Sequence, residues 1–169
     1  MLFKSLLFIG ALLLSEQSYA EQHFSWVNWP VVGNTELTWG WWTIYQAQLR
    51  TPSGQYQANN DNNIALIIRY EREIDASDLL QATDEQWQHL GYSQQQRQVW
   101  LKSLQGIWPN VRQGDRLIFV VQDEVGYFLF QNKVIGTISN PSLNRAFLAI
   151  WLSPNSSYPK LRLELIGRE

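Results

Sequence analysis

The stretch Ile64-Ala65-Leu66-Ile67-Ile68-Arg69-Tyr70 is apolar or aromatic except for one charged residue. A short apolar run of this length, rich in β-branched residues, is typical of a strand that is buried on both faces for most of its length. Because side chains alternate along a strand, Ile64 and Tyr70 face one side and Arg69 faces the other. The stretch therefore predicts an internal strand of a covered sheet.

Further strands are expected on both sides of this run. Residues 24–33 predict an edge strand or an extended lead-in, interrupted by Pro30. Residues 35–50 form a long β-rich segment, in which Gly40 indicates a bulge or bend between two strand segments. After the central run, three strands are expected at 116–122, 126–131 and 134–138, the last two joined by a tight turn at Asn132-Lys133.

Capping and stop signals predict four helices. Ser77 or Asp75, Ser93, and Asn140 followed by Pro141 are typical of helix N-termini, while Gly91 stops the first helix. The expected ranges are about 77–90, 94–108, 141–152 and 159–166. Strands, two helices, a strand meander and two more helices indicate a single α+β domain, with the helices on one side of a large, mainly antiparallel sheet.

The composition excludes several classes of protein. The chain has 169 residues, 13 Lys and Arg against 15 Asp and Glu, and a formal net charge of −2. This balance argues against a nucleic-acid binder or a polybasic membrane-surface module, both of which need a basic face. The absence of cysteine excludes disulfides, thiolate catalysis and cysteine zinc sites. With two histidines in the sequence, no metal site and no cofactor is expected.

The first twenty residues have the pattern of a secretory signal peptide. Lys4 precedes an apolar run at residues 6–14, and small residues stand at Ser18 and Ala20. A run of this length is too short to span a bilayer of about 30 Å. We therefore expect cleavage after Ala20, a domain at residues 21–169 without an integral membrane span, and a periplasmic or secreted protein.

An ordered set of segments resembles the chalcone isomerase-like superfamily, in its exported bacterial branch. The segments are GWWTIYQAQL at 40–49, ALIIRY at 65–70, WL at 100–101, WPNV at 108–111, GD at 114–115, VIG at 134–136, AFLAIWLSP at 146–154 and PKLR at 159–162. The resemblance implies an open-faced β-sandwich, in which a large antiparallel sheet carries a layer of helices on one face. It also implies a cleft between sheet and helices, which binds chalcones in plant isomerases and fatty acids in related non-catalytic members.

The catalytic residues of the plant isomerases do not map onto this chain. The position of their Thr falls near Gly40 and Trp42, with Thr43 displaced. Their Arg falls at Asn34-Thr35-Glu36, and their Tyr at Ala76-Ser77-Asp78. The resemblance therefore implies the fold, and no catalytic residue is assigned.

Five residues are candidates for a ligand site. They lie in the tryptophan-rich segment and at the end of the central strand: Trp41, Thr43, Tyr45, Arg69 and Tyr70. An aromatic-lined apolar pocket with few polar anchors is typical of small-molecule sites. In one continuous strand, Trp41, Thr43 and Tyr45 would share a face. Arg69 would bind a ligand carboxylate or, alternatively, pair with Glu71 or Asp78 at the strand end.

The sequence leaves three functions open. The favoured one is an exported, non-catalytic protein that binds a small apolar or amphipathic ligand such as a fatty acid. The second is an isomerase or intramolecular lyase acting on an enone-like substrate, because cyclisation depends more on positioning than on a strong base. The third is a periplasmic protein-interaction module, which a large exposed apolar patch and the lack of a closed cavity would favour.

Overall fold

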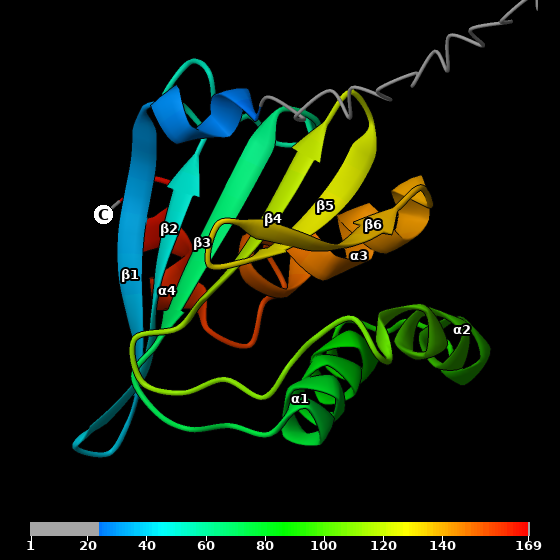
Figure 1. Cartoon of the computed structure of the whole chain (residues 1–169). Helices are drawn as coiled ribbons and strands as arrows, with labels where there is room; N and C mark the ends of the chain where they lie inside the picture. Colours follow the sequence, from blue (N-terminus) through cyan, green and yellow to red (C-terminus); the bar gives the residue numbers. More distant parts are fainter. Residues whose placement is uncertain (1–23, 169) are drawn as a thin grey trace, which may run out of the picture.

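The computed structural model describes residues 24–168, and the predicted signal peptide lies outside this range. A six-stranded antiparallel sheet runs in chain order from β1 to β6 (Figure 1). The strands are β1 (Val31–Trp39), β2 (Trp42–Arg50), β3 (Ile64–Tyr70), β4 (Arg116–Gln122), β5 (Val125–Phe130) and β6 (Lys133–Ile138). β3 lies between β2 and β4, as its apolar sequence predicts.

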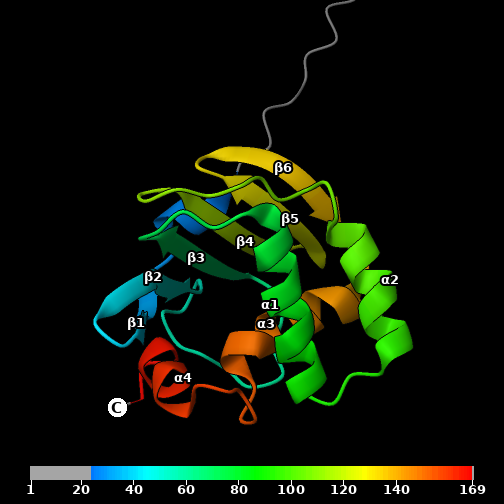
Figure 2. The ribbon, with the colours of Figure 1, turned by 90° about the horizontal axis from the view of Figure 1, so that it is seen from below.

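Four α-helices cover one face of the sheet (Figure 2). They are α1 (Ala76–His89), α2 (Gln94–Leu104), α3 (Pro141–Leu152) and α4 (Pro159–Leu165). Part of the opposite face is covered by a short 3-10 helix, η1 (Ser25–Asn28), where Trp26 and Trp29 pack with Ala65, Ile118 and Val120. The expected α+β class, with one helical layer on an antiparallel sheet, is confirmed.

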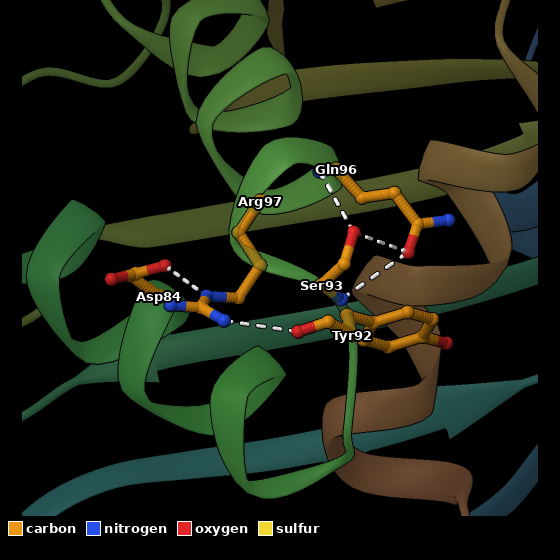
Figure 3. A network of polar contacts seen from close by, with 5 residues as sticks. All are labelled: Asp84, Tyr92, Ser93, Gln96 and Arg97. Carbon is orange, nitrogen blue, oxygen red and sulfur yellow. Dashed lines mark hydrogen bonds and ion pairs between the residues drawn. The ribbon is translucent and has the colours of Figure 1, made fainter.

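Local side-chain chemistry sets the ends and the angle of α1 and α2. Ser93 forms a capping box with Gln96: its hydroxyl accepts from the Gln96 amide at 3.2 Å, and the Gln96 side chain accepts from the Ser93 amide at 3.3 Å. Arg97 then ties the two helices together (Figure 3), since it donates to Asp84 at 2.7 Å and to the Tyr92 carbonyl at 2.9 Å. This network fixes the α1–α2 corner.

The main core lies between the sheet and the helices and is rich in aromatic rings. Trp87 is fully buried, and its indole donates to the Ala146 carbonyl at 2.8 Å, which joins α1 to α3. Trp100 packs edge-on against Trp87 at 5.3 Å between ring centroids. Most tryptophans thus bury a large apolar ring area, and the indole N–H can donate a hydrogen bond to a neighbouring helix or strand.

α4 packs closely against the edge strand β1. An ideal Cβ at Gly33 would lie 2.2 Å from the Glu164 carbonyl oxygen, so no other residue fits there without moving the helix. Two residues further on, the Thr35 hydroxyl donates to the Glu164 carboxylate at 2.6 Å. This contact places the C-terminal segment beside the first strand.

Three predictions about the sheet and helices were wrong in detail. Residues 25–28 form a 3-10 helix, so the strand begins only at Val31. Gly40 separates two strand segments as predicted, but it lies in a tight turn that reverses the chain, so that Trp39 pairs with Trp42, and not in a bulge or bend. Trp108 lies outside α2, because that helix ends at Leu104 before Gly106 adopts a φ of 83°.

Candidate ligand-binding site

An apolar cavity of about 190 Å³ lies between the sheet and the helices. Its floor is formed by residues of β1 to β4, and its walls by α1 and α3, with Ile74, Trp108 and Tyr158 from the connecting segments. Apolar side chains predominate, including Ile44, Ile68, Leu117 and Phe147. Asp78, in the first turn of α1, is the one lining residue among the described residues whose side chain ordinarily carries a charge.

Two tyrosine hydroxyls lie on the sheet side of the cavity, whereas Asp78, Thr83 and Gln86 add polar side chains from α1. Tyr45 and Tyr70 are directly opposite each other on β2 and β3, with ring centroids 6.3 Å apart. Trp151 of α3 donates its indole N–H to the Tyr45 hydroxyl at 3.0 Å, which leaves the hydroxyl proton of Tyr45 free for another acceptor. Burial and the neighbouring Tyr45 set the environment of the Tyr70 hydroxyl, with no side-chain hydrogen bond from the residues that the structure describes.

Burial controls the protonation of both hydroxyls. Desolvation raises the pKa of Tyr45 and of Tyr70 well above the ordinary tyrosine value, because the phenolate would have to lie in an apolar site. The hydrogen bond from Trp151 opposes this rise in pKa at Tyr45 only in part. Both side chains are therefore neutral donors and acceptors throughout the physiological pH range.

Trp108 contributes a further polar group to the cavity wall. The ring is buried and packs edge-on against Phe128 at 5.4 Å and tilted against Phe147 at 5.7 Å. Its indole N–H is buried and has no acceptor among residues 24–168. A buried donor without a partner costs about 1–3 kcal/mol. Sequence reasoning missed this residue as part of the site, because it assigned the ring to a helical stripe.

Arg69 does not line the cavity. It lies on the opposite face of β3, its side chain is 55% exposed, and its Nε lies 3.8 Å from the Glu71 carboxylate. Arg69 therefore pairs with Glu71 at the strand end, which is the alternative to ligand binding that the sequence left open. The alternation of side chains along β3 predicts that Arg69 faces away from Tyr70. A wider, open hollow lined in part by Gln46, Arg69 and Arg116 shares no lining residue with the cavity.

A β-bulge separates the other candidates. Leu37 pairs with Tyr45 and Thr38 pairs with Thr43, so Ile44 is the extra residue on β2. Tyr45 therefore faces the cavity, whereas the Thr43 hydroxyl donates to Glu36 on the other face at 3.1 Å. Trp41 lies at the hairpin tip and is fully exposed. Of the five predicted site residues, the cavity brings together Tyr45 and Tyr70; the expectation that Trp41, Thr43 and Tyr45 share a face was wrong.

No group of three or more His, Cys, Asp or Glu side chains within residues 24–168 is arranged to hold a metal ion. None of the helices in this range has both the length and the apolar character required to cross a bilayer.

The fold agrees with comparisons to known proteins. A family model described as chalcone isomerase-like matches residues 42–167, which is most of the chain. This protein therefore belongs to the chalcone isomerase-like family, and the resemblance seen in the sequence segments is confirmed at that level.

Two similar proteins extend the comparison. A protein of Haemophilus influenzae described as uncharacterized is 30% identical over 141 residues, which cover 83% of this chain and 69% of that protein. The crystal structure of a fatty-acid binding protein of Arabidopsis thaliana superposes with a TM-score of 0.58 at 10% sequence identity, over 81% of this chain and 86% of that chain. The low identity of the second match means that it shows the fold alone.

Proposed function

We propose that this protein is an exported, non-catalytic binding protein for a small apolar or amphipathic molecule of the fatty-acid class. The observation that carries the proposal is the apolar cavity with its two neutral tyrosine hydroxyls. A mainly apolar cavity with a few convergent polar groups is the usual form of a small-molecule site. The fatty-acid binding protein with the same fold supports this class of ligand.

The polar groups of the cavity favour an uncharged ligand head. Tyr45 and Tyr70 offer hydroxyl groups to a ligand. Arg69, the cation that the sequence suggests as a partner for a ligand carboxylate, lies on the other face of the sheet. A buried carboxylate that lacks a cation pays a desolvation penalty of several kcal/mol. Asp78 adds a like charge beside the cavity. We therefore propose that the head is a carbonyl, a hydroxyl or a protonated carboxyl group.

The size of the cavity limits how much of a ligand it encloses. Ligand pockets usually measure about 300–1,000 Å³, and an engineered apolar cavity of about 150 Å³ suffices for benzene. A cavity of about 190 Å³ therefore encloses a ring, or the head and first methylenes of a chain. The remainder of a longer acyl chain leaves through the mouth, which lies beside the exposed residues Asp78, Ala82 and Tyr158.

Calorimetric titration with matched ligands tests the proposal. We expect a fatty acid methyl ester and the corresponding fatty alcohol to bind at least as tightly as the ionised acid of the same length. In a series of growing chain length, affinity should rise by about 0.8 kcal/mol per methylene and then level off once the cavity is full. Ionised acids that bind more than about tenfold tighter than their esters would contradict the uncharged head. If no ester, alcohol or acid of any chain length binds, the proposed ligand-binding function is overturned.

Two further measurements address catalysis and export. With chalcone substrates we expect no turnover above background, since the catalytic residues of the isomerases do not map onto this chain. Mass spectrometry of the protein from the cell envelope should find Glu21 as the N-terminal residue. Turnover that disappears on changing Tyr45 and Tyr70 to Phe would instead support the intramolecular lyase.

A further inference from the structure

Three tryptophans project from the molecule at the tip of the β1–β2 hairpin. The hairpin tip, residues 39–42, carries Trp39 at 73%, Trp41 at 100% and Trp42 at 61% exposure. Gly40, with a φ of 59°, takes the first position of the two-residue loop, as it does in type II′ turns. Figure 1 shows this turn extending beyond the sheet, at the end where the chain leaves β3 towards α1.

Exposed apolar side chains are not clustered in this way elsewhere among the described residues. Five other large apolar or aromatic side chains of the described residues are exposed, and no two of them are consecutive in the sequence: Val27, Val31, Val99, Tyr158 and Leu163. Single exposed apolar residues need no explanation, but a contiguous group marks an interaction site. The hairpin tip is the group of that kind within residues 24–168.

We propose that the hairpin tip docks this protein onto the surface of a lipid bilayer, with the three indoles at the level of the headgroups. Tryptophan is the side chain most typical of this layer, because its large ring is apolar and its N–H is polar. The proposal goes beyond ligand binding in the cavity and is tested without any ligand.

The size of the tip favours a bilayer over a protein partner. Scaled by their exposed fractions, the three side chains offer roughly 350–600 Å². A stable protein interface buries about 800 Å² on each partner. A narrow ribbon tip falls short of that area, whereas insertion into a fluid headgroup layer surrounds each ring and needs no flat complementary face.

One cation beside the tip can reach a phosphate-bearing surface, and acidic Glu71 and Glu73 flank it in the chain. The Arg72 guanidinium lies over the Trp42 ring, 5.5 Å from its centroid, and its side chain is exposed. A cation held at the base of an indole can contact lipid phosphate while the ring enters the headgroup layer. Trp42 and Arg72 therefore present the two chemical groups that such a surface binds.

The tip also lies close to the cavity. Pairing places Trp39 opposite Trp42 and Leu37 opposite Tyr45, so these four side chains lie on one side of the ribbon. Leu37 lines the cavity and lies two residues, roughly 7 Å, from Trp39. Docking by the tip would therefore bring the cavity side of the hairpin towards the lipid.

Flotation with vesicles of phosphatidylethanolamine and phosphatidylglycerol tests the proposal, using protein purified after export so that all variants share one N-terminus. We expect the wild-type protein to float with the vesicles and Trp41→Ser to weaken its partitioning about tenfold, which corresponds to losing about a quarter of the burial of one indole. Changing Trp39, Trp41 and Trp42 together to Ser should abolish flotation. Val99→Ser is the matched control, since Val99 is 59% exposed on α2, and should float like the wild type.

The outcomes separate this proposal from the function of the cavity. Trp41→Ser must keep the urea midpoint and the ester affinity of the wild type, because its side chain touches neither the core nor the cavity. A wild-type protein that fails to float, or a Trp41→Ser variant that floats equally well, overturns docking and leaves ligand binding untouched. A concentration-dependent dimer that Trp41→Ser dissociates would also overturn it, in favour of a second copy as occupant.

Discussion

Tyr45 and Tyr70 lie opposite each other on β2 and β3, and the same substitution to Phe should affect stability differently at the two positions. Tyr45→Phe removes the acceptor of the Trp151 indole, which lies 3.0 Å from the hydroxyl and is 8% exposed. An orphaned buried donor costs about 1–3 kcal/mol, and because this bond is only partly buried we expect about 1–2 kcal/mol of lost stability. Tyr70→Phe removes a hydroxyl that has no side-chain hydrogen bond from residues 24–168, so its effect on stability should stay within about 0.5 kcal/mol.

Urea unfolding followed by circular dichroism measures this difference. With a slope of about 1–3 kcal/mol per molar urea, Tyr45→Phe should lower the midpoint by roughly 0.5–1 M and Tyr70→Phe should leave it nearly unchanged. In ligand titrations both variants should lose about two- to tenfold in affinity for a fatty acid ester, as expected for one hydrogen bond each. Equal destabilisation by the two substitutions, or a stable Tyr45→Phe variant, would refute the assigned hydrogen bonding.

Three further predictions concern the helical layer and the pH dependence of stability. Gly33→Ala should cost about 2–4 kcal/mol in urea unfolding, because the new methyl group must displace the Glu164 backbone; a cost below 1 kcal/mol would argue against that close packing. Arg97→Gln should cost about 1–2 kcal/mol by loosening the α1–α2 corner, whereas Arg69→Gln, at an exposed ion pair, should be nearly neutral in the same assay. The two cavity tyrosines have raised pKa values in the folded state, so the folded state holds their protons more tightly than the unfolded state does. Their contribution to the free energy of unfolding should be complete below pH 10 and should fall by about 1.4 kcal/mol per pH unit per tyrosine above it. Unfolding at stepwise alkaline pH measures this slope, and a slope unchanged by Tyr70→Phe would exclude that residue as a source.

The fold could be predicted from the sequence because its signals are local and agree with one another. Ser93 and Asn140 cap α2 and α3 by accepting backbone amides, as their positions before apolar helical stripes predict. The apolar alternation of β3 gives the correct face to Arg69 and Tyr70. Each of these features depends on residues within a few positions of one another, where periodicity and capping chemistry are reliable guides.

The candidate site was harder to predict from the sequence than the fold, because it depends on a one-residue irregularity and on contacts between distant segments. The turn at Gly40 places Trp41 at the hairpin tip, and the bulge at Ile44 puts Thr43 and Tyr45 on opposite faces of the sheet. A single inserted residue cannot be recognised in an alternating sequence pattern. Trp108 was assigned to a helix because it continued the apolar spacing of α2 beyond its end. Its place in the cavity wall follows from tertiary packing, which no local pattern records.

The hydrogen bond between Trp151 and Tyr45 joins residues 106 positions apart, and the bond between Thr35 and Glu164 joins residues 129 positions apart. Contacts of such long sequence separation form late, since the entropy of closing the intervening loop opposes them. During synthesis the β1–β2 hairpin is complete when more than half of the chain has yet to be made, while the α3 wall of the cavity is still missing. The cavity is therefore assembled last, and a chain truncated before α3 would retain the tryptophan-bearing hairpin but no enclosed cavity.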